Sequence, residues 1–147
     1  MERPWGVGIV ITDPNRSLFL VERKCDRYPY KQYRGAYSFI GGGCEAGETV
    51  EGTLFRELGE EMTPKMADEV SKVARHLFDV SITKGDTYDY SLFESVLPVR
   101  MFDGIEAHKI EEGKGVVVAR DKLVEVPFIW GLEDVVDLYL RGHGSLR

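Results

Sequence analysis

The sequence predicts an α+β fold in which a mixed β-sheet is flanked by helices. Strand-like apolar segments precede, separate and follow two segments with helical periodicity. Turns of hairpin length join the strand-like segments, whereas an all-parallel sheet would need longer crossover connections. A length of 147 residues fits one hydrophobic core. We therefore expect a single domain over residues 1–147.

A β-hairpin is predicted near the start of the chain. Residues 6–12 and 17–23 are rich in β-branched and apolar side chains. The residues between them, DPNR, favour a turn because proline fixes φ and Asp and Asn tolerate turn conformations. Residues 24–35 are polar, aromatic and basic without periodicity, which predicts an ordered loop.

The next segment predicts a short strand, a glycine loop and a helix. Residues 36–40 read as the strand, and the three glycines at 41–43 allow positive φ, which favours a loop. Residues 49–62 form the helix, with Thr49 as its N-cap and Pro64 preventing its continuation. The apolar stripe of this helix consists of Val50, Leu54, Phe55, Leu58 and Met62.

The remaining elements are a long hairpin, a strand and a second helix. Residues 70–83 and 87–97 alternate apolar and polar side chains around a Lys-Gly-Asp turn, and a helical start to the first arm stays open. Residues 116–119 read as a strand. Residues 132–140 predict an amphipathic helix that ends before Gly142.

Composition excludes several classes of protein. Hydrophobic residues at 43% and charged residues at 30% are typical of globular proteins. No apolar run approaches the roughly 18 residues of a membrane-spanning helix. The formal net charge of −6 disfavours long nucleic acid as a partner. Cys25 and Cys44 form no CxxC pair, which favours free thiols and a cytoplasmic protein.

Three carboxylates share one side of the helix predicted at residues 49–62. Glu60 lies three positions after Glu57, and Glu61 lies four positions after it. On a helical wheel, Glu61 falls about 20° from Val50, inside the apolar stripe. Carboxylates held together at a half-buried position need a cation, and oxygen ligands suit Mg²⁺ or Mn²⁺. The alternative is a solvated acidic helix with ion pairs to Arg56 or Lys65.

The spacing of these residues resembles the Nudix box of the MutT-like Nudix hydrolase family. The matching pattern is Gly42, five residues, Glu48, seven residues, Arg56-Glu57-Leu58, one residue and Glu60-Glu61. Two departures are present: Thr63-Pro64 replaces the Gly-aliphatic end of the box, and Ile40 stands where many members have proline. The resemblance implies an α/β/α sandwich and metal-dependent hydrolysis of a diphosphate linkage.

The resemblance also implies roles for individual residues. Glu57 and Glu61 would be direct metal ligands, Glu60 a ligand or a carboxylate that orients water, and the carbonyl of Gly41 a backbone ligand. Arg56 would orient a box glutamate, with Glu48 as its partner in the loop or as a water-mediated metal ligand. Glu112 is a candidate general base, with an ordinary solvated loop as the alternative; His108 has the same two interpretations.

Basic and aromatic residues supply candidate substrate contacts. The resemblance places Arg23 at the position of a phosphate-contacting arginine, and the planar guanidinium of arginine suits phosphate oxygens. Arg27 and Arg34 follow on the loop. Tyr28, Tyr30 and Tyr33 either stack on a base or cover the edge of the sheet. Phe128 and Trp130 are a second wall of the pocket or, as we favour, core residues.

The expected function is a Mg²⁺- or Mn²⁺-dependent pyrophosphohydrolase that converts a nucleoside triphosphate to a monophosphate and pyrophosphate. A nucleotide sugar, a dinucleoside polyphosphate or a capped RNA end are alternative substrates. A nucleotide-binding regulator and a diphosphate isomerase are alternative functions. The expected partners are a small nucleotide and, as an open alternative, a second copy of the chain.

Overall fold

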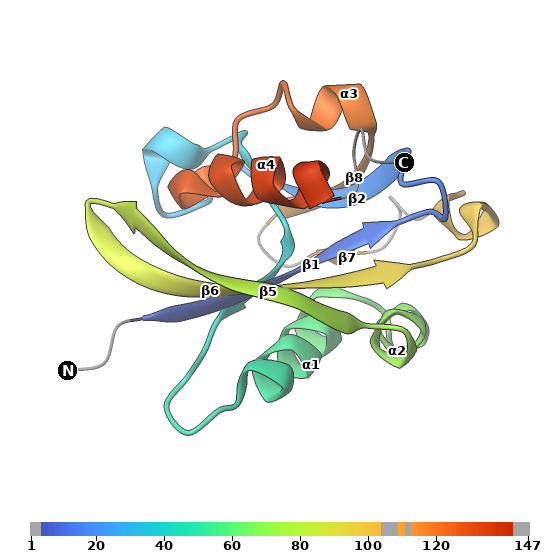
Figure 1. Cartoon of the computed structure of the whole chain (residues 1–147), viewed down its shortest axis with the longest axis horizontal. Helices are drawn as coiled ribbons and strands as arrows, with labels where there is room; N and C mark the ends of the chain where they lie inside the picture. Colours follow the sequence, from blue (N-terminus) through green and yellow to red (C-terminus); the bar gives the residue numbers. More distant parts are fainter. Residues whose placement is uncertain (1–3, 104–108, 111–112, 143–147) are drawn as a thin grey trace.

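The computed structural model describes residues 4–103, 109–110 and 113–142. An eight-stranded sheet lies between two layers of helices, which confirms the predicted fold class (Figure 1). The strands are β1 (Trp5–Thr12), β2 (Leu18–Lys24), β3 (Tyr37–Ser38), β4 (Ile40–Gly43), β5 (Arg75–Lys84), β6 (Asp86–Val96), β7 (Lys109–Ile110) and β8 (Gly113–Ala119). The α-helices are α1 (Val50–Glu61), α2 (Pro64–Lys72), α3 (Arg120–Leu123) and α4 (Glu133–Gly142). Within the described ranges, the 3₁₀ segments are η1 (Lys31–Tyr33), η2 (Val99–Phe102) and η4 (Ile129–Gly131).

The sheet is mixed and it divides into two arms, one that contains β1 and β4 and one that contains β2 and β3. The main strand order is β5-β6-β1-β2-β8-β7, with β1 and β6 parallel and the other pairs antiparallel. β1 and β2 pair at Ile11–Leu20 and Thr12–Phe19. The earlier part of β1 pairs with β4, and the later part of β2 pairs with β3. The sheet therefore forks beside the glycine strand β4.

The two faces of the sheet carry separate hydrophobic clusters. Ile9 and Ile11 pack on the side of α1 and α2, whereas Val10 between them packs on the side of α4. This alternation follows from the opposite directions of successive side chains in a strand. Figure 1 shows α1 and α2 on one face and α3 and α4 on the other. None of the helices within the described residues has the length and the apolar composition of a membrane span.

The glycines at 41–43 form a strand, so the predicted loop is wrong. They belong to β4, which pairs with β1, and the strand predicted at residues 36–40 is interrupted at Phe39. Gly41 has a φ of 153°, and a Cβ at this position would lie 2.1 Å from the carbonyl oxygen of Val7. A larger residue at Gly41 would therefore push β4 away from β1.

The helix predicted at residues 49–62 is α1, and a second helix follows it directly. Thr49 caps α1 by accepting a hydrogen bond from the backbone N–H of Gly52. Pro64 does not only stop α1; it also occupies the first turn of α2, which Thr63 caps. The departure from the family box thus marks a helix restart. Phe55 is 51% exposed, so its place in the buried stripe is wrong, because α1 turns that flank to solvent.

The later elements match the prediction with shifted boundaries. β5 and β6 form the long hairpin, and the helical start of the first arm is the separate helix α2. Gly85 takes a φ of 81° in the turn. β8 begins at Gly113, earlier than the expected residue 116, and α4 continues to Gly142 rather than ending before it.

A buried carboxylate ties four elements together at the far end of β6. Glu94, whose side chain is fully buried, accepts two hydrogen bonds from Arg16, at 2.9 and 3.0 Å. Arg75 in β5 and the Tyr139 hydroxyl in α4 also donate to it, at 2.9 and 2.6 Å. Burial by itself raises the pKa of the Glu94 carboxyl, but these hydrogen bonds outweigh it and lower the pKa to about 2.

Removing the Tyr139 hydroxyl tests how much this network stabilises the fold. Tyr139→Phe keeps the ring and deletes one hydrogen bond to a charged group, so we expect a loss of about 1.5 to 3 kcal/mol in the free energy of unfolding. Tyr37→Phe is the control, since the Tyr37 hydroxyl has no hydrogen bond to the described residues. Urea unfolding at pH 7 measures both variants. Equal stability of the two would contradict a stabilising role.

Acid unfolding of Glu94→Gln tests the same carboxylate through its charge. Because the pKa of Glu94 is lower in the folded protein, its contribution is complete above about pH 4.5 and disappears as pH falls towards 2. Glu94→Gln should therefore be less stable at pH 7 and should lose less stability than wild type between those pH values. Parallel curves of unfolding free energy against pH would refute this.

Candidate active site

The carboxylates of α1 lie beside the glycine strand. The Glu57 carboxylate packs against Gly42, where a Cβ would lie 2.3 Å from its Oε1 atom. Glycine at this position therefore lets a charged side chain approach the backbone of β4. The helix is held there because Leu54 and Leu58 are completely buried in the cluster between α1 and the sheet. The spacing of the sequence thus places a carboxylate of α1 against β4, whose glycines leave the backbone accessible.

Arg56 is the centre of an ionic network on α1. Its Nη1 atom donates to Oε1 of Glu57 at 3.1 Å and to Oε1 of Glu60 at 3.2 Å. Its Nε and Nη2 atoms donate to the two oxygens of Glu48, at 2.7 and 3.0 Å. Nη2 also donates to the carbonyl of Gly43 at 3.1 Å. One guanidinium therefore gathers carboxylates from the helix and from the loop before it.

Glu48 fixes the loop between β4 and α1. Besides its two bonds to Arg56, its Oε1 atom accepts hydrogen bonds from the backbone N–H of Glu45 and the hydroxyl of Thr53. The hydrogen bond from Arg56 is the main reason that the pKa of Glu48 falls to about 2. The same bond raises the pKa of Arg56. Both groups stay charged at neutral pH, so the loop and helix remain connected.

Glu61 lies where the helical wheel places it. The residue is 4% exposed at the end of α1, and its Oε2 atom is shielded from solvent. Among the described residues, no three His, Cys, Asp or Glu side chains are close enough together to hold a metal ion on their own. The donors still fit a hard divalent cation, since they are all oxygens. Because Gly42 has no Cβ, the Glu57 carboxylate can lie directly against the backbone of β4.

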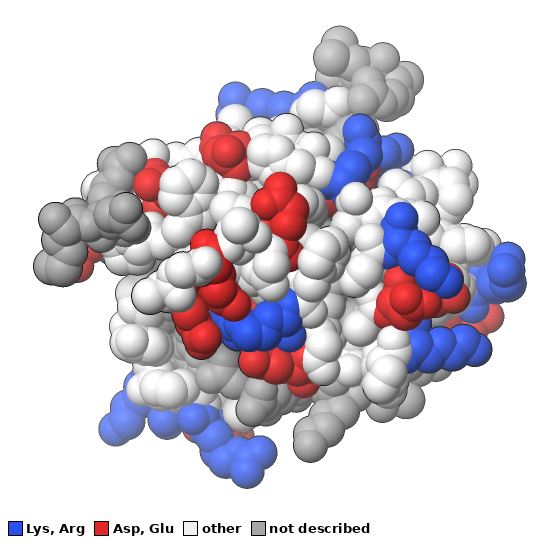
Figure 2. Space-filling view, turned by 90° about the horizontal axis from the view of Figure 1, so that it is seen from below, with Lys and Arg blue, Asp and Glu red and all other residues white. Residues whose placement is uncertain are grey.

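The surface around α1 carries both signs of charge. Figure 2 views the molecule from the side of α1 and α2 and shows acidic and basic side chains close together rather than one uniform acidic area. The four carboxylates within 4.0 Å of Arg56 account for part of this mixture; they belong to Glu45, Glu48, Glu57 and Glu60. Local pairing, more than net charge, therefore sets the electrostatics of this face.

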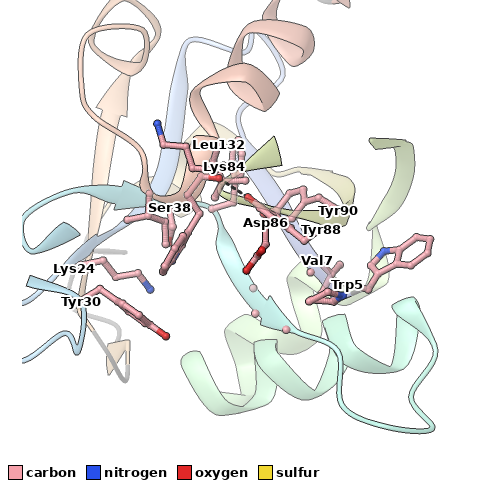
Figure 3. Close-up of a pocket in the computed structure, with 18 of the residues that line it drawn as sticks. Trp5, Val7, Lys24, Tyr30, Ser38, Lys84, Asp86, Tyr88, Tyr90 and Leu132 are labelled. Atoms are coloured by element: carbon pink, nitrogen blue, oxygen red, sulfur yellow. Dashed lines mark hydrogen bonds between the residues drawn. The ribbon is translucent and has the colours of Figure 1, made fainter. Parts of the chain in front are cut away.

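A pocket of about 540 Å³ opens at the fork of the sheet. Its floor includes the glycines of β4 and the start of β1, and aromatic side chains from several separate segments form its walls (Figure 3). The aromatic lining residues are Trp5, Tyr28, Tyr30, Phe39, Tyr88, Tyr90 and Trp130. Gly41, Gly42 and Gly43 line the pocket, and Gly42 also contacts Glu57. The pocket and the α1 carboxylates thus share the glycine strand.

The cation that β2 contributes to this pocket is Lys24. Lys24 is 8% exposed, its ammonium is 3.0 Å from Oε2 of the buried Glu22, and it lies over the ring of Tyr28. The predicted Arg23, Arg27 and Arg34 are exposed and do not line the pocket. Strand alternation explains the choice, because neighbours in β2 point to opposite faces. Lys24 shares its face of β2 with the buried Glu22, and the pairing of β2 decides that this face meets the pocket.

The aromatic wall is braced by hydrogen bonds and ring contacts. Trp130 has a φ of 53°, an unusual conformation for a bulky residue, and its carbonyl accepts a 2.6 Å bond from the Tyr88 hydroxyl. Its indole packs on Tyr30 and Tyr33, both with centroids 4.8 Å away. Burial raises the pKa of Tyr88 to about 12, which keeps its hydroxyl protonated as a donor.

The remaining predicted residues have varied positions. Tyr33 supports Trp130 and is absent from the pocket lining, and Arg34 donates to the carbonyl of Tyr28 at 2.8 Å, which holds the loop. Phe128 is a core residue, 3% exposed. Cys25 and Cys44 are free thiols. The side chains of His108 and Glu112 lie outside the described residues.

The solved structures that resemble this chain include MutT proteins and the NUDIX domain of NrtR. A MutT protein from Methanosarcina mazei Go1 is 16% identical with a TM-score of 0.67, and the alignment covers 99% of both chains. A MutT structure from a study of Aliivibrio salmonicida and Vibrio cholerae is 22% identical, with a TM-score of 0.61 over 96% of this chain and 99% of that one. The NUDIX domain of Shewanella oneidensis NrtR, complexed with ADP ribose, is 14% identical, with a TM-score of 0.64 over 98% and 90%.

These likenesses show the fold, and the family follows from the sequence match. No curated protein matches the chain. The family model described as NUDIX domain matches residues 2–128, which include the strands of both arms, the glycine strand and α1. The chain therefore belongs to the NUDIX family and is a Nudix hydrolase, a class that acts on nucleoside diphosphate derivatives and generally uses divalent metal ions.

Proposed function

We propose that this protein hydrolyses a nucleoside triphosphate to a nucleoside monophosphate and pyrophosphate with Mg²⁺ or Mn²⁺. The observation that carries the proposal is the Arg56 network beside the glycine strand, because it places several carboxylates next to a pocket of about 540 Å³. The pocket combines aromatic walls, which suit a base, with a lysine, which suits phosphate. A nucleotide would span from the aromatic wall to the β4 glycines.

The α1 carboxylates would hold the metal. Glu57, Glu60 and Glu61 are the proposed side-chain ligands, with the carbonyl of Gly41 as a backbone ligand. When bound, a divalent ion neutralises diphosphate oxygens and lowers the pKa of a coordinated water. The contribution of Arg56 and Glu48 is positional: their paired charges hold Glu57 and Glu60 at the end of the pocket. Glu112 remains a proposed general base.

Lys24 would contact the diphosphate. Its ammonium lies at the pocket, and Glu22 and the Tyr28 ring restrict its position. A cation with restricted motion loses little entropy on binding phosphate. The exposed guanidinium groups of Arg23 and Arg27 lie outside the pocket lining, so we assign them at most a role in attracting the anionic substrate.

A nucleotide-binding regulator is the second candidate function. The NrtR NUDIX domain supports it by its fold and by the ADP ribose in that structure. This chain, however, covers 64% of the length of an intact NrtR chain. Retention of Glu48, Arg56, Glu57, Glu60 and Glu61 favours hydrolysis. A nucleotide sugar or a dinucleoside polyphosphate would use the same diphosphate site.

A substrate screen is the direct test of hydrolysis. Purified protein with Mg²⁺ or Mn²⁺ is incubated with nucleoside triphosphates, nucleotide sugars and dinucleoside polyphosphates, and chromatography identifies the products. We expect a monophosphate and pyrophosphate from a triphosphate, with turnover abolished by a chelator. Tight nucleotide binding without any turnover would instead support the regulator.

Glu61→Gln tests the metal site on α1. The amide keeps the volume of the side chain and removes a buried negative charge, so we expect turnover to fall by at least about 100-fold, with the melting temperature retained or raised. Glu51→Gln, on the exposed first turn of the same helix, is the control. Unchanged Mg²⁺-dependent turnover in Glu61→Gln would contradict the assignment.

Arg56→Lys tests the positioning network. A lysine keeps the charge but cannot donate to Glu48, Glu57 and Glu60 in the same planar arrangement. We expect a roughly 10- to 100-fold decrease in kcat, with a smaller change in KM, and a higher concentration of Mg²⁺ for half-maximal rate. Lys72→Arg on α2 controls for a change of cation type on the surface. A normal dependence on Mg²⁺ would exclude a positioning role.

Lys24 and Arg23 can be compared directly. The double variant Glu22→Gln/Lys24→Met removes both members of the buried pair, which avoids an uncompensated charge. We expect its KM for the triphosphate to rise roughly tenfold, because an ammonium–phosphate contact is lost. Arg23→Met should change KM less than twofold. The opposite ranking would return the phosphate contact to Arg23.

A further inference from the structure

The turn between β5 and β6 brings one carboxylate to the pocket. Asp86 is the first residue of β6, directly after Gly85, whose φ of 81° makes the tight reversal. Alternate residues of a strand share a face, so Asp86 lies on the same face as Tyr88 and Tyr90. All three line the pocket. Figure 3 shows the Asp86 carboxylate pointing into the space between Tyr30 and Trp5.

The Asp86 carboxylate is available to a ligand. Three charged residues line the pocket, and of these Asp86 is the one acid within the described part of the chain. Its side chain forms no hydrogen bond or ion pair with any described residue, although Lys84 faces it in the strand register. Lys24 is already paired with Glu22. An ionised carboxylate accepts hydrogen bonds and cannot donate them, so its ligand must present N–H or O–H groups.

The strand order separates this carboxylate from the phosphate-binding end. Asp86 belongs to β6, whereas Lys24 belongs to β2, and β1 with its partner β4 lies between them. Glu57 packs against Gly42 of β4, and Arg56 donates to the carbonyl of Gly43 in the same strand. Tyr88 and Tyr90, which share a face of β6 with Asp86, also line the pocket. A nucleotide bound with its diphosphate near β4 would therefore direct its base towards β6.

We propose that Asp86 selects the base and that it favours guanine; this deepens, and rests on, the proposed function. Guanine presents adjacent N1–H and N2-amino donors, which the two oxygens of one carboxylate accept together. Adenine and cytosine present one amino group next to a ring nitrogen that is an acceptor. The N3–H of uracil lies between two carbonyl oxygens, which repel a carboxylate. Guanine nucleotides are therefore the substrate class that this pocket takes.

Inosine and xanthosine triphosphates provide matched tests. ITP lacks the 2-amino group of GTP and is otherwise the same, so wild type should prefer GTP by roughly 10- to 100-fold in kcat/KM, the value of one hydrogen bond to a charged group. Asp86→Asn presents one acceptor and one donor, which fits the N1–H and C2 carbonyl of xanthine. The variant should therefore lose the preference for GTP over ITP and turn over XTP better than wild type.

Two controls make the result specific to Asp86. Asp68→Asn removes an exposed carboxylate from α2 and should keep the wild-type ranking of the four nucleotides GTP, ITP, XTP and ATP. Equilibrium binding of GMP and IMP, followed by the fluorescence of Trp5 and Trp130 in the pocket, needs neither metal nor turnover. Wild type should bind GMP more tightly than IMP, and Asp86→Asn should not.

The outcomes separate this proposal from the proposed function. Failure to hydrolyse any triphosphate, combined with an Asp86-dependent preference for GMP, would reject the function and support base selection. Equal kcat/KM for GTP and ITP in wild type would overturn base selection while hydrolysis stands. Loss of turnover for all four nucleotides in Asp86→Asn, with unchanged binding of GMP and IMP, would also overturn it and assign Asp86 to the chemistry.

Discussion

The site depends on one guanidinium that neutralises several carboxylates. Like charges at neighbouring positions of a helix repel one another, and the end of α1 has Glu57, Glu60 and Glu61 within five residues. Arg56 offsets this repulsion by binding Glu57 and Glu60 through one nitrogen and Glu48 through two others. The same group bonds to the Gly43 carbonyl and so connects helix, loop and strand. Without it, the loop would lose its main attachment to α1.

The forked sheet gives this network its neighbourhood. Because β1 and β2 pair at two positions near one end, the other end accommodates β4 and β3 and leaves room for the pocket. At the end of the sheet where β1 and β2 pair, the fully buried Glu94 binds Arg16 in the turn after β1. It also binds Arg75 of β5 and Tyr139 of α4 at this closed end. A rigid closed end and an open fork place the aromatic wall, the glycine strand and the α1 carboxylates around one space. The geometry of the site is thus a consequence of strand pairing.

Periodicity predicted the elements whose burial repeats regularly along the chain. The helical wheel correctly placed Glu61 inside the apolar stripe, and hydroxyl chemistry identified Thr49 as the N-cap. The wheel failed at Phe55 because it gives the width of an apolar stripe but not how much of that stripe the sheet covers. The glycines at 41–43 read as a loop because a strand of glycine is stable only when its neighbour, here β1, supplies the hydrogen bonds.

Contacts between distant segments set the limit of prediction within the site. Arg23 and Lys24 are adjacent cations, and only the pairing of β2 decides which of them reaches the pocket. Asp86 reads as an ordinary turn residue until the hairpin is placed beside Trp130 and the glycine strand. The box residues were predictable because their spacing is local to one loop and one helix.

Metal binding without nucleotide is the decisive measurement for the α1 carboxylates. We expect Mn²⁺, titrated alone and followed by electron paramagnetic resonance, to bind wild type and to bind Glu57→Gln at least about tenfold more weakly, because a ligand against β4 is lost. Glu69→Gln on α2 should bind as wild type does. Equal Mn²⁺ affinity in wild type and Glu57→Gln would contradict the claim that the α1 carboxylates beside the glycine strand are the metal site.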